Sequence, residues 1–308
     1  MPQLDGGGSD GGNDRMAFGG PHYGPENRIM MSCDRMAFGG PQVQLEQFLG
    51  GYVMYISVAR PFLLTIDNVC SERRFVAVVP PYTKHRVAGP RSLRSILVEA
   101  ETVPPSLLQD ERVRLGGKRA AAWAARIEEG FQRWQAGAYD PDRDSFDLFF
   151  FGERLPYRNL DKRVALAVDH IRSSTDGWQT TTSAIAKDVT LSPSRLRHLF
   201  CEQVGVPIRS FRAWKRFRNA IQIALQESNI LKLAMAAGYA DATHFCHSMK
   251  LYCGEQPTWV CAHWRTATFV HADKSEHEPL PRAANDRTRR SSVLDGALMA
   301  CSHDRDEV

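Results

Sequence analysis

Residues 190–205 read TLSPSRLRHLFCEQVG and contain the start, the buried face and the end of one helix. Ser192 is a strong N-cap residue, and Pro193 suits the first helical turn, where its missing N–H costs nothing. Gly205 is a typical residue for ending a helix. The apolar residues at helical spacing between these ends form the buried stripe: Leu196, Leu199 and Phe200. The stretch therefore predicts a short amphipathic helix.

The face opposite this stripe is polar and basic, because it carries Ser194, Arg195, Arg197 and His198. A shorter helix is expected just before it, over SAIAKDV at 183–189. Two short helices joined by three or four residues, the second with exposed basic side chains, form a helix-turn-helix that places a recognition helix in the major groove. We therefore expect this segment to bind double-stranded DNA.

An altered copy of the pattern follows a long helix expected over about 208–226. The long helix has the length of a spacer of about 28 Å at 1.5 Å per residue. Beyond it, Asp241 replaces Ser192 as the cap and Phe245 replaces Leu196 in the apolar stripe, each 49 residues later. One side of the long helix is basic through Arg209, Arg212, Lys215, Arg216 and Arg218.

Positive charge is concentrated in this half of the chain. Residues 158–265 contain 15 Lys and Arg against 8 Asp and Glu, so they carry +7 and the remaining residues carry −3 of the total of +4. A basic domain attached to a mildly acidic remainder favours a polyanionic partner for the basic part, although a basic face can also be merely solvated.

The composition is that of an ordinary globular protein, with 43% hydrophobic and 24% charged residues among 308. A chain of this length usually has two domains. No run of about 18 apolar residues occurs and the first residues lack the features of a secretion signal, so we expect a soluble, cytoplasmic protein without a membrane partner. The seven cysteines form no CxxC pair, which favours reduced thiols over disulfides or a zinc site.

The two ends of the chain have polar, low-complexity sequences. Residues 1–44 are rich in Gly, Asp and Asn, and they contain the octapeptide DRMAFGGP twice, at Asp14–Pro21 and Asp34–Pro41. One repetition cannot build a solenoid, so we expect a disordered extension, the remnant of a duplication, or a misplaced start codon. Residues 272–308 are likewise expected to form a disordered polar tail.

Between these regions, residues 45–152 begin with a sequence pattern typical of strands and continue with one typical of helices. Short runs rich in β-branched and aromatic residues, such as YVMYISV and FLLTIDNV, predict an antiparallel sheet or small barrel. Residues 118–135 place apolar side chains at helical spacing, and this helix could form a dimer face or cover the barrel. Its apolar residues include Trp123, Ile127, Phe131 and Trp134. The boundary to the basic domain is expected near 152–161.

The basic domain resembles the DNA-binding domain of the AraC/XylS transcription regulators. The second unit matches the string typical of that family through Ile230, Ala234, Gly238, Tyr239, Asp241, His244, Phe245, Lys250, Gly254 and Pro257. The first unit supplies Ala186, Leu191, Ser192, Leu196, Phe200 and Gly205. The resemblance implies an α+β protein: an all-α double helix-turn-helix domain at 158–265, preceded by a small cupin-like antiparallel β-barrel with flanking helices, with disordered ends.

The resemblance also implies which side chains meet DNA. Base-reading positions are Ser194, Arg195, Arg197, His198, Ala242, Thr243 and His247. Phosphate contacts are implied for Lys187, Arg216 and Lys250. Arginine pairs bidentately with guanine, whereas Ala and Thr offer little beyond methyl contacts, so the first unit is expected to set most of the sequence specificity. The chain departs from the family pattern at His247, Met249, Val260 and Cys261, which weakens contacts in the second unit.

The N-terminal half is implied to sense a small-molecule effector or to form a homodimer, and RNA polymerase is an expected partner if the protein activates transcription. His85 is a candidate ligand contact, but a lone histidine is more often a satisfied or surface residue. No metal ligands cluster, so neither metal nor cofactor is expected. Two rivals stay open: an enzyme joined to a DNA-binding domain, which lacks clustered His and carboxylate ligands here, and a nonfunctional remnant that binds DNA without specificity.

Overall fold

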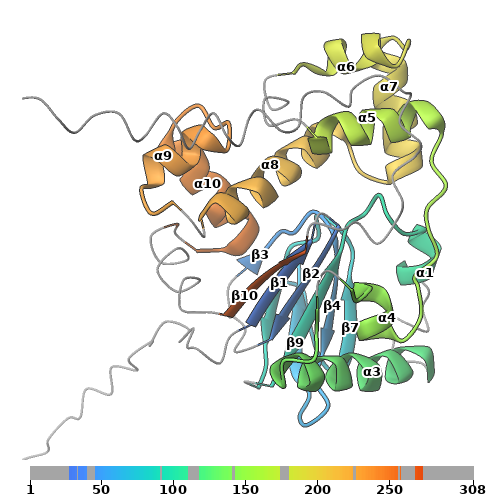
Figure 1. The fold of residues 1–308 in the computed structure, drawn as a ribbon, viewed down its shortest axis with the longest axis vertical. Coiled ribbons are helices and arrows are strands. Elements are labelled where there is room, and N and C mark those ends of the chain that lie inside the picture. Colours follow the sequence, from blue (N-terminus) through green and yellow to red (C-terminus); the bar gives the residue numbers. More distant parts are fainter. Residues whose placement is uncertain are drawn as a thin grey trace, which may run out of the picture. The chain divides into compact units, whose positions relative to one another are not determined.

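In the computed structural model, strands dominate the first part of the chain and helices the second (Figure 1). The structure describes residues 28–32, 34–39, 46–90, 92–109, 118–140, 143–173, 180–224, 227–255, 257 and 268–272. These residues belong to one compact unit, which ends at Lys274. Within them, every helix is too short or too polar to cross a lipid bilayer.

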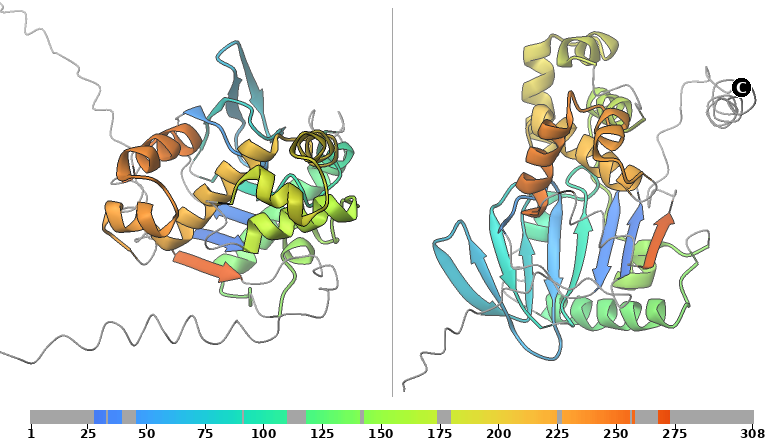
Figure 2. Two further views of the ribbon diagram at one scale, coloured as in Figure 1. Left: turned by 90° about the horizontal axis from the view of Figure 1, so that it is seen from above. Right: turned by 90° about the vertical axis from the view of Figure 1, so that its left-hand side faces the viewer.

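The strands form two sheets with the orders β10-β1-β2-β9-β4-β7 and β3-β8-β5-β6. The larger sheet contains β1 (Arg28–Ser32), β2 (Arg35–Gly39), β4 (Tyr52–Ile56), β7 (Val76–Val79), β9 (Arg94–Val98) and β10 (Thr268–Ala272). The smaller contains β3 (Glu46–Gln47), β5 (Phe62–Ile66), β6 (Cys70–Arg74) and β8 (His85–Ala88). The described pairs are antiparallel, as expected, except that β10 lies parallel to β1 at the sheet edge (Figure 2).

The expectation that residues 1–44 are disordered is wrong for 28–32 and 34–39. These residues form β1 and β2, and the second octapeptide copy supplies β2, between β1 and β9. The apolar side chains of β1, namely Ile29, Met30 and Met31, are fully buried, so the pair of strands is held by the core. Among the residues that the structure describes, the sheet therefore begins at Arg28 rather than near residue 45. The first octapeptide copy and residues 273–308 lie outside the described residues, whereas Ala272 ends β10.

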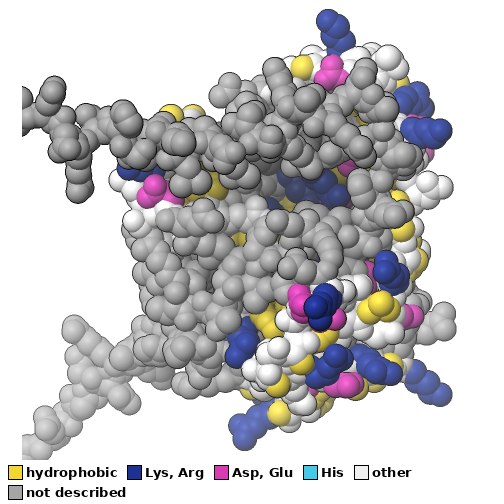
Figure 3. All heavy atoms as spheres, in the orientation of Figure 1, with side chains coloured by type: hydrophobic (Ala, Val, Ile, Leu, Met, Phe, Trp, Pro, Cys, Tyr) yellow, Lys and Arg dark blue, Asp and Glu magenta, His cyan; other side chains and the backbone are white. Residues whose placement is uncertain are grey.

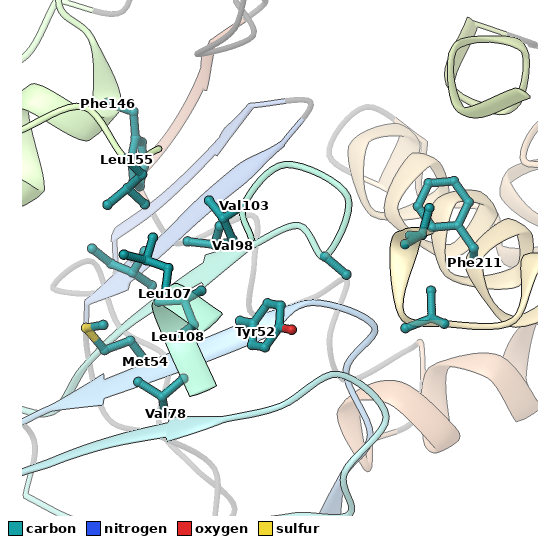
Figure 4. Close-up of a cluster of buried hydrophobic side chains, with 14 of the residues drawn as sticks. Tyr52, Met54, Val78, Val98, Val103, Leu107, Leu108, Phe146, Leu155 and Phe211 are labelled. Atoms are coloured by element: carbon teal, nitrogen blue, oxygen red, sulfur yellow. The ribbon is translucent and has the colours of Figure 1, made fainter. Parts of the chain in front are cut away.

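The predicted helix at 118–135 covers the sheet. It is α3 (Lys118–Gln135), and its four large apolar residues named above are at most 2% exposed, so they do not form a dimer face. Phe131 lies against β2, because a Cβ on Gly39 would be 3.1 Å from its ring. Two shorter helices, α1 (Pro105–Gln109) and α4 (Phe146–Phe151), complete the cover. Figure 4 shows Leu107 and Leu108 beside Met54 of the sheet.

The second half of the chain contains the helices α5 (Lys162–Ser173), α6 (Thr182–Asp188), α7 (Pro193–Val204), α8 (Ile208–Ala224), α9 (Ile230–Ala236) and α10 (Ala242–Cys253). This order confirms the expected pair of short helices, spacer helix and second pair. Leu196 and Phe245 are both fully buried, as their equivalent places in the repeated pattern predict. The apolar core continues from the sheets into these helices, because Phe211 belongs to the same buried cluster as Tyr52 and Met54.

Candidate DNA-contacting surface

The first recognition-helix candidate, α7, has the predicted ends. Ser192 has an extended backbone (φ −71°, ψ 151°), and its Oγ accepts a hydrogen bond from the Arg195 backbone N–H at 3.2 Å. Gly205 is left-handed with φ of 82°, a region that side chains disfavour. With the apolar stripe buried, the opposite face exposes all four residues predicted to read bases: Ser194, Arg195, Arg197 and His198. Figure 3 shows separate Lys and Arg side chains at the surface in the region where Figure 1 labels α5, α6 and α7.

The second candidate, α10, repeats this arrangement. The Asp241 carboxylate accepts a hydrogen bond from the His244 backbone N–H at 2.7 Å, and Gly254 is left-handed with φ of 77°. Thr243 and His247 are exposed, and Ala242 is half-buried. The α10 face is thus open to solvent, but it carries no arginine among its outward residues.

Of the three residues predicted to contact phosphates, two are free of the protein core. Lys187 and Lys250 are exposed. Arg216 is half-buried: its Nη1 donates to the Gly238 carbonyl at 3.5 Å, and its guanidinium lies 4.4 Å from the centroid of the Tyr239 ring. This cation–π contact joins α8 to the turn between α9 and α10, so Arg216 has a structural task within the domain.

The expected basic side of α8 is divided between surface and interior. Arg209 is exposed, but Lys215 and Arg218 are each only 6% exposed and face carboxylates of the sheet. The sequence expectation that they belong to a basic outer face is therefore wrong. The reason is long-range, because their partners Glu99 and Glu101 precede them by more than a hundred residues.

These two glutamates form a buried ionic junction that the sequence did not suggest. Lys215 Nζ lies 2.8 Å from Glu99 Oε2 and 2.7 Å from Glu101 Oε1. Arg172 of α5 adds a second cation, with Nη2 2.7 Å from Glu101 Oε1. Burial alone would raise the pKa of Glu101, but Lys215 and then Arg172 outweigh burial and hold that pKa well below its ordinary value of 4.5.

His85, the candidate ligand contact, is buried at the start of β8 in the smaller sheet. Its Nδ1 is 2.8 Å from the Thr83 carbonyl oxygen, and its Nε2 is 2.8 Å from the Tyr55 hydroxyl, which also contacts Gln47. Burial lowers the pKa of His85. Both ring nitrogens are engaged within the protein, so a ligand would have to replace one of these partners. In the part of the chain that the structure describes, His, Cys, Asp and Glu form no group suited to a metal ion.

Two outward positions of α10 were missed by sequence reasoning. The 49-residue offset that matches Phe245 to Leu196 also matches His244 to Arg195 and Cys246 to Arg197. His244 is exposed and Cys246 is half-buried. Applying the offset uniformly to every residue of α7 would have found both.

Comparison with known proteins agrees with this geometry. Residues 185–260 match the family model described as a helix-turn-helix domain. The chain is similar to the arabinose operon regulatory proteins of Escherichia coli K12 and Salmonella typhimurium LT2, with 29% identity over 100 residues in each case. These 100 residues are 32% of this chain and 34% and 36% of the relatives, so the match spans about a third of their length.

Among solved structures, ToxT from Vibrio cholerae O395 resembles 77% of this chain and 96% of its own, with 12% identity and a TM-score of 0.45. The family match, the two arabinose regulators and the repeated capped units agree on the second half of the chain. Residues 185–260 therefore form a helix-turn-helix domain, as the sequence predicted, and the relatives that share this part of the chain are arabinose operon regulators.

Proposed function

We propose that this protein is a sequence-specific DNA-binding transcription regulator whose α7 and α10 enter successive major grooves. The observation that carries this proposal is that one structural unit occurs twice, 49 residues apart. Each copy is a helix with an N-cap, a buried residue four positions after the cap (Leu196 or Phe245), and a polar face that points outward. Two such units joined by a rigid helix suit a duplex better than any small ligand, because successive major grooves repeat along the DNA axis.

The two units contribute unequally to this recognition. In α7, Arg195 and Arg197 offer guanidinium groups that pair bidentately with guanine. In α10, Thr243 and Ala242 each offer a methyl group, and His247 offers a single ring donor or acceptor. We assign base reading to these residues together with Ser194 and His198, and phosphate contacts chiefly to Lys187 and Lys250, which position the protein without specifying sequence.

The sheet part of the chain is proposed to control this activity, through a small-molecule effector or through homodimer formation. RNA polymerase would be a further partner if the bound protein activates transcription. A role for His85 in effector binding stays a prediction. It would require the effector to take over a hydrogen bond now made to Tyr55 or Thr83.

The test is selection of binding sites from random duplex DNA by the full chain, followed by footprinting. One protected site of about two helical turns supports the proposal. Arg197→Ala should then weaken binding to that site by about 1–3 kcal/mol and relax the preference at one base pair. Lys250→Ala should weaken binding to all sequences alike and reduce the salt dependence.

Arg126→Ala is the matched control, because Arg126 is an exposed arginine of α3, outside the helix-turn-helix domain. It should leave binding unchanged. Uniform, steeply salt-dependent binding with no selected sequence would contradict the proposal and favour a protein that binds DNA without specificity. An equal loss on selected and random DNA for Arg197→Ala would reject Arg197 as a base reader.

A further inference from the structure

Residues 99–101, directly after β9, connect the sheet to α5 and to the end of α7. Glu101 binds Arg172 of α5 through both Nε and Nη2, at 3.1 and 2.7 Å. The Ala100 carbonyl accepts a hydrogen bond from Arg158 Nη1 at 3.1 Å, and the same nitrogen donates to the Val204 carbonyl at the end of α7, at 3.2 Å. One short segment therefore holds α5 and α7.

The same segment holds the spacer helix α8. Glu99 is completely buried, and its two carboxylate oxygens accept from Trp214 Nε1 at 3.1 and 2.8 Å. Lys215 and Arg218 also reach this carboxylate, at 2.8 and 3.3 Å. Trp214 and Arg218 are four residues apart, so they lie one turn apart on one face of α8, and the contacts fix the rotation of α8 about its axis.

Two further contacts prevent the helix from shifting along the sheet. A Cβ on Gly50 would lie 2.3 Å from Cγ of Trp214, so the loop before β4 packs directly onto the indole with no space to spare. Arg218 Nη2 donates to the Ser32 carbonyl of β1 at 2.6 Å. The indole is thus held from the loop before β4 and the guanidinium from β1, which defines a position along α8 as well as a rotation.

The second unit is also attached to this junction. The backbone N–H of Phe48 donates to the Tyr252 carbonyl in the last turn of α10, at 3.3 Å. The Tyr252 ring lies 5.2 Å from that of Trp214, centroid to centroid. The sheet therefore contacts α5, α7, α8 and α10, which together carry both recognition helices.

A charged junction constrains geometry more closely than an apolar one. Apolar contacts tolerate sliding and repacking. A buried carboxylate that accepts a hydrogen bond from an indole and forms ion pairs with an ammonium and a guanidinium can make all three contacts in few arrangements. The carboxylates of Glu99 and Glu101 pair with Lys215, Arg218 and the partly exposed Arg172, and Arg158 binds backbone carbonyls of the same segment and of α7. These contacts together hold the segment, α5 and α8 in one arrangement.

The spacer helix α8 has 17 residues, or about 25 Å at 1.5 Å per residue, and it separates the two units. We propose that Glu99 and Glu101 are positioning residues for DNA recognition: by fixing α5 and α8 from the sheet, they set the separation of α7 and α10 and so select the spacing between two half-sites. The inference rests on the proposed function, which supplies the DNA. It assigns to the sheet part a share in specificity although none of its residues touches a base.

The experiment uses the full chain and duplexes that carry the two half-sites of its selected sequence. The dissociation constant is measured with the half-sites at the selected spacing and with the DNA between them one base pair longer or shorter. The spacing preference is the ratio of the dissociation constant at the altered spacing to that at the selected spacing. Glu99→Gln and Glu101→Gln should each reduce this ratio by about fivefold or more, because each loosens the coupling between the two units. Binding to the half-site read by α7 alone should stay within about twofold of the unchanged protein.

Asp147→Asn is the matched control, because it weakens another buried ion pair of the sheet part, with Arg35, without touching α8. It should lower stability but preserve the spacing preference. Arg172→Gln is a milder variant, since the Arg172 side chain is 23% exposed. It replaces Glu99→Gln or Glu101→Gln if either of these does not fold. An unchanged ratio in folded variants overturns the positioning role, whereas failure of the unchanged protein to select any sequence overturns the proposed function instead.

Discussion

Arg35→Ala should destabilise the protein strongly, and by more than Arg15→Ala, at the same place in the identical first octapeptide. The Arg35 side chain is fully buried and binds Asp147 bidentately, with Nε–Oδ1 at 2.8 Å and Nη2–Oδ2 at 3.1 Å. Its Nη1 donates to Thr102 Oγ1 at 2.8 Å. The substitution leaves a buried carboxylate without its cation, which costs about 3–5 kcal/mol.

All of these contacts are made by Arg35 and stay in place in Arg15→Ala, so we expect Arg15→Ala to lower the free energy of unfolding by less than Arg35→Ala does. Both variants are measured by urea unfolding followed by circular dichroism and tryptophan fluorescence. The comparison is sharp because the eight residues DRMAFGGP surround each arginine identically. Equal losses in the two variants, or a larger loss for Arg15→Ala, would refute the assignment of the second copy to β2.

Three further predictions follow from the ionic junction, a helix cap and a close contact. Lys215 and Arg172 lower the pKa of Glu101 in the folded protein from 4.5 to about 2. The ionised Glu101 side chain therefore contributes its full stabilisation above pH 4.5, and this stabilisation is lost as the pH falls towards 2. Acid titration of the unfolding midpoint should therefore be less steep in Glu101→Gln; an equal slope would contradict this. Asp241→Ala should cost about 0.5–2 kcal/mol by removing the α10 cap, measured by urea unfolding, whereas no loss would argue against the cap. Gly50→Ala should cost about 1–3 kcal/mol and change the tryptophan fluorescence, because its methyl group would collide with Trp214; an unchanged spectrum and midpoint would show that the loop is not tightly packed.

The helix-turn-helix units were predictable because the signals that define them are local. The hydroxyl of Ser192 reaches a backbone N–H only three residues away, and the same holds for the Asp241 carboxylate. Helical spacing places Leu196 on the inner face whatever it packs against. The ends, inner face and exposed face of α7 and α10 therefore followed from stretches of about a dozen residues.

The assignment of the second octapeptide to the sheet could have been suspected from its neighbours, but not from the repeat itself. Residues 28–32, before the second copy, read RIMMS and offer apolar side chains to a core, whereas residues 8–12, before the first copy, read GSDGG. What fixes Arg35 in place is Asp147, 112 residues further along the chain. No pattern within the octapeptide could indicate that partner.

The sequence by itself determined the capped helices α7 and α10, their order and the residues they expose, because helix formation depends on neighbours within one or two turns. Only the tertiary structure decided which charges meet. Lys215 and Arg218 read as part of a basic outer face, yet they are buried against Glu99, whose carboxylate also binds Trp214 across 115 residues of sequence. A cation is equally suited to solvent, phosphate or a buried carboxylate, so its role is set by what the fold brings within about 3 Å of it.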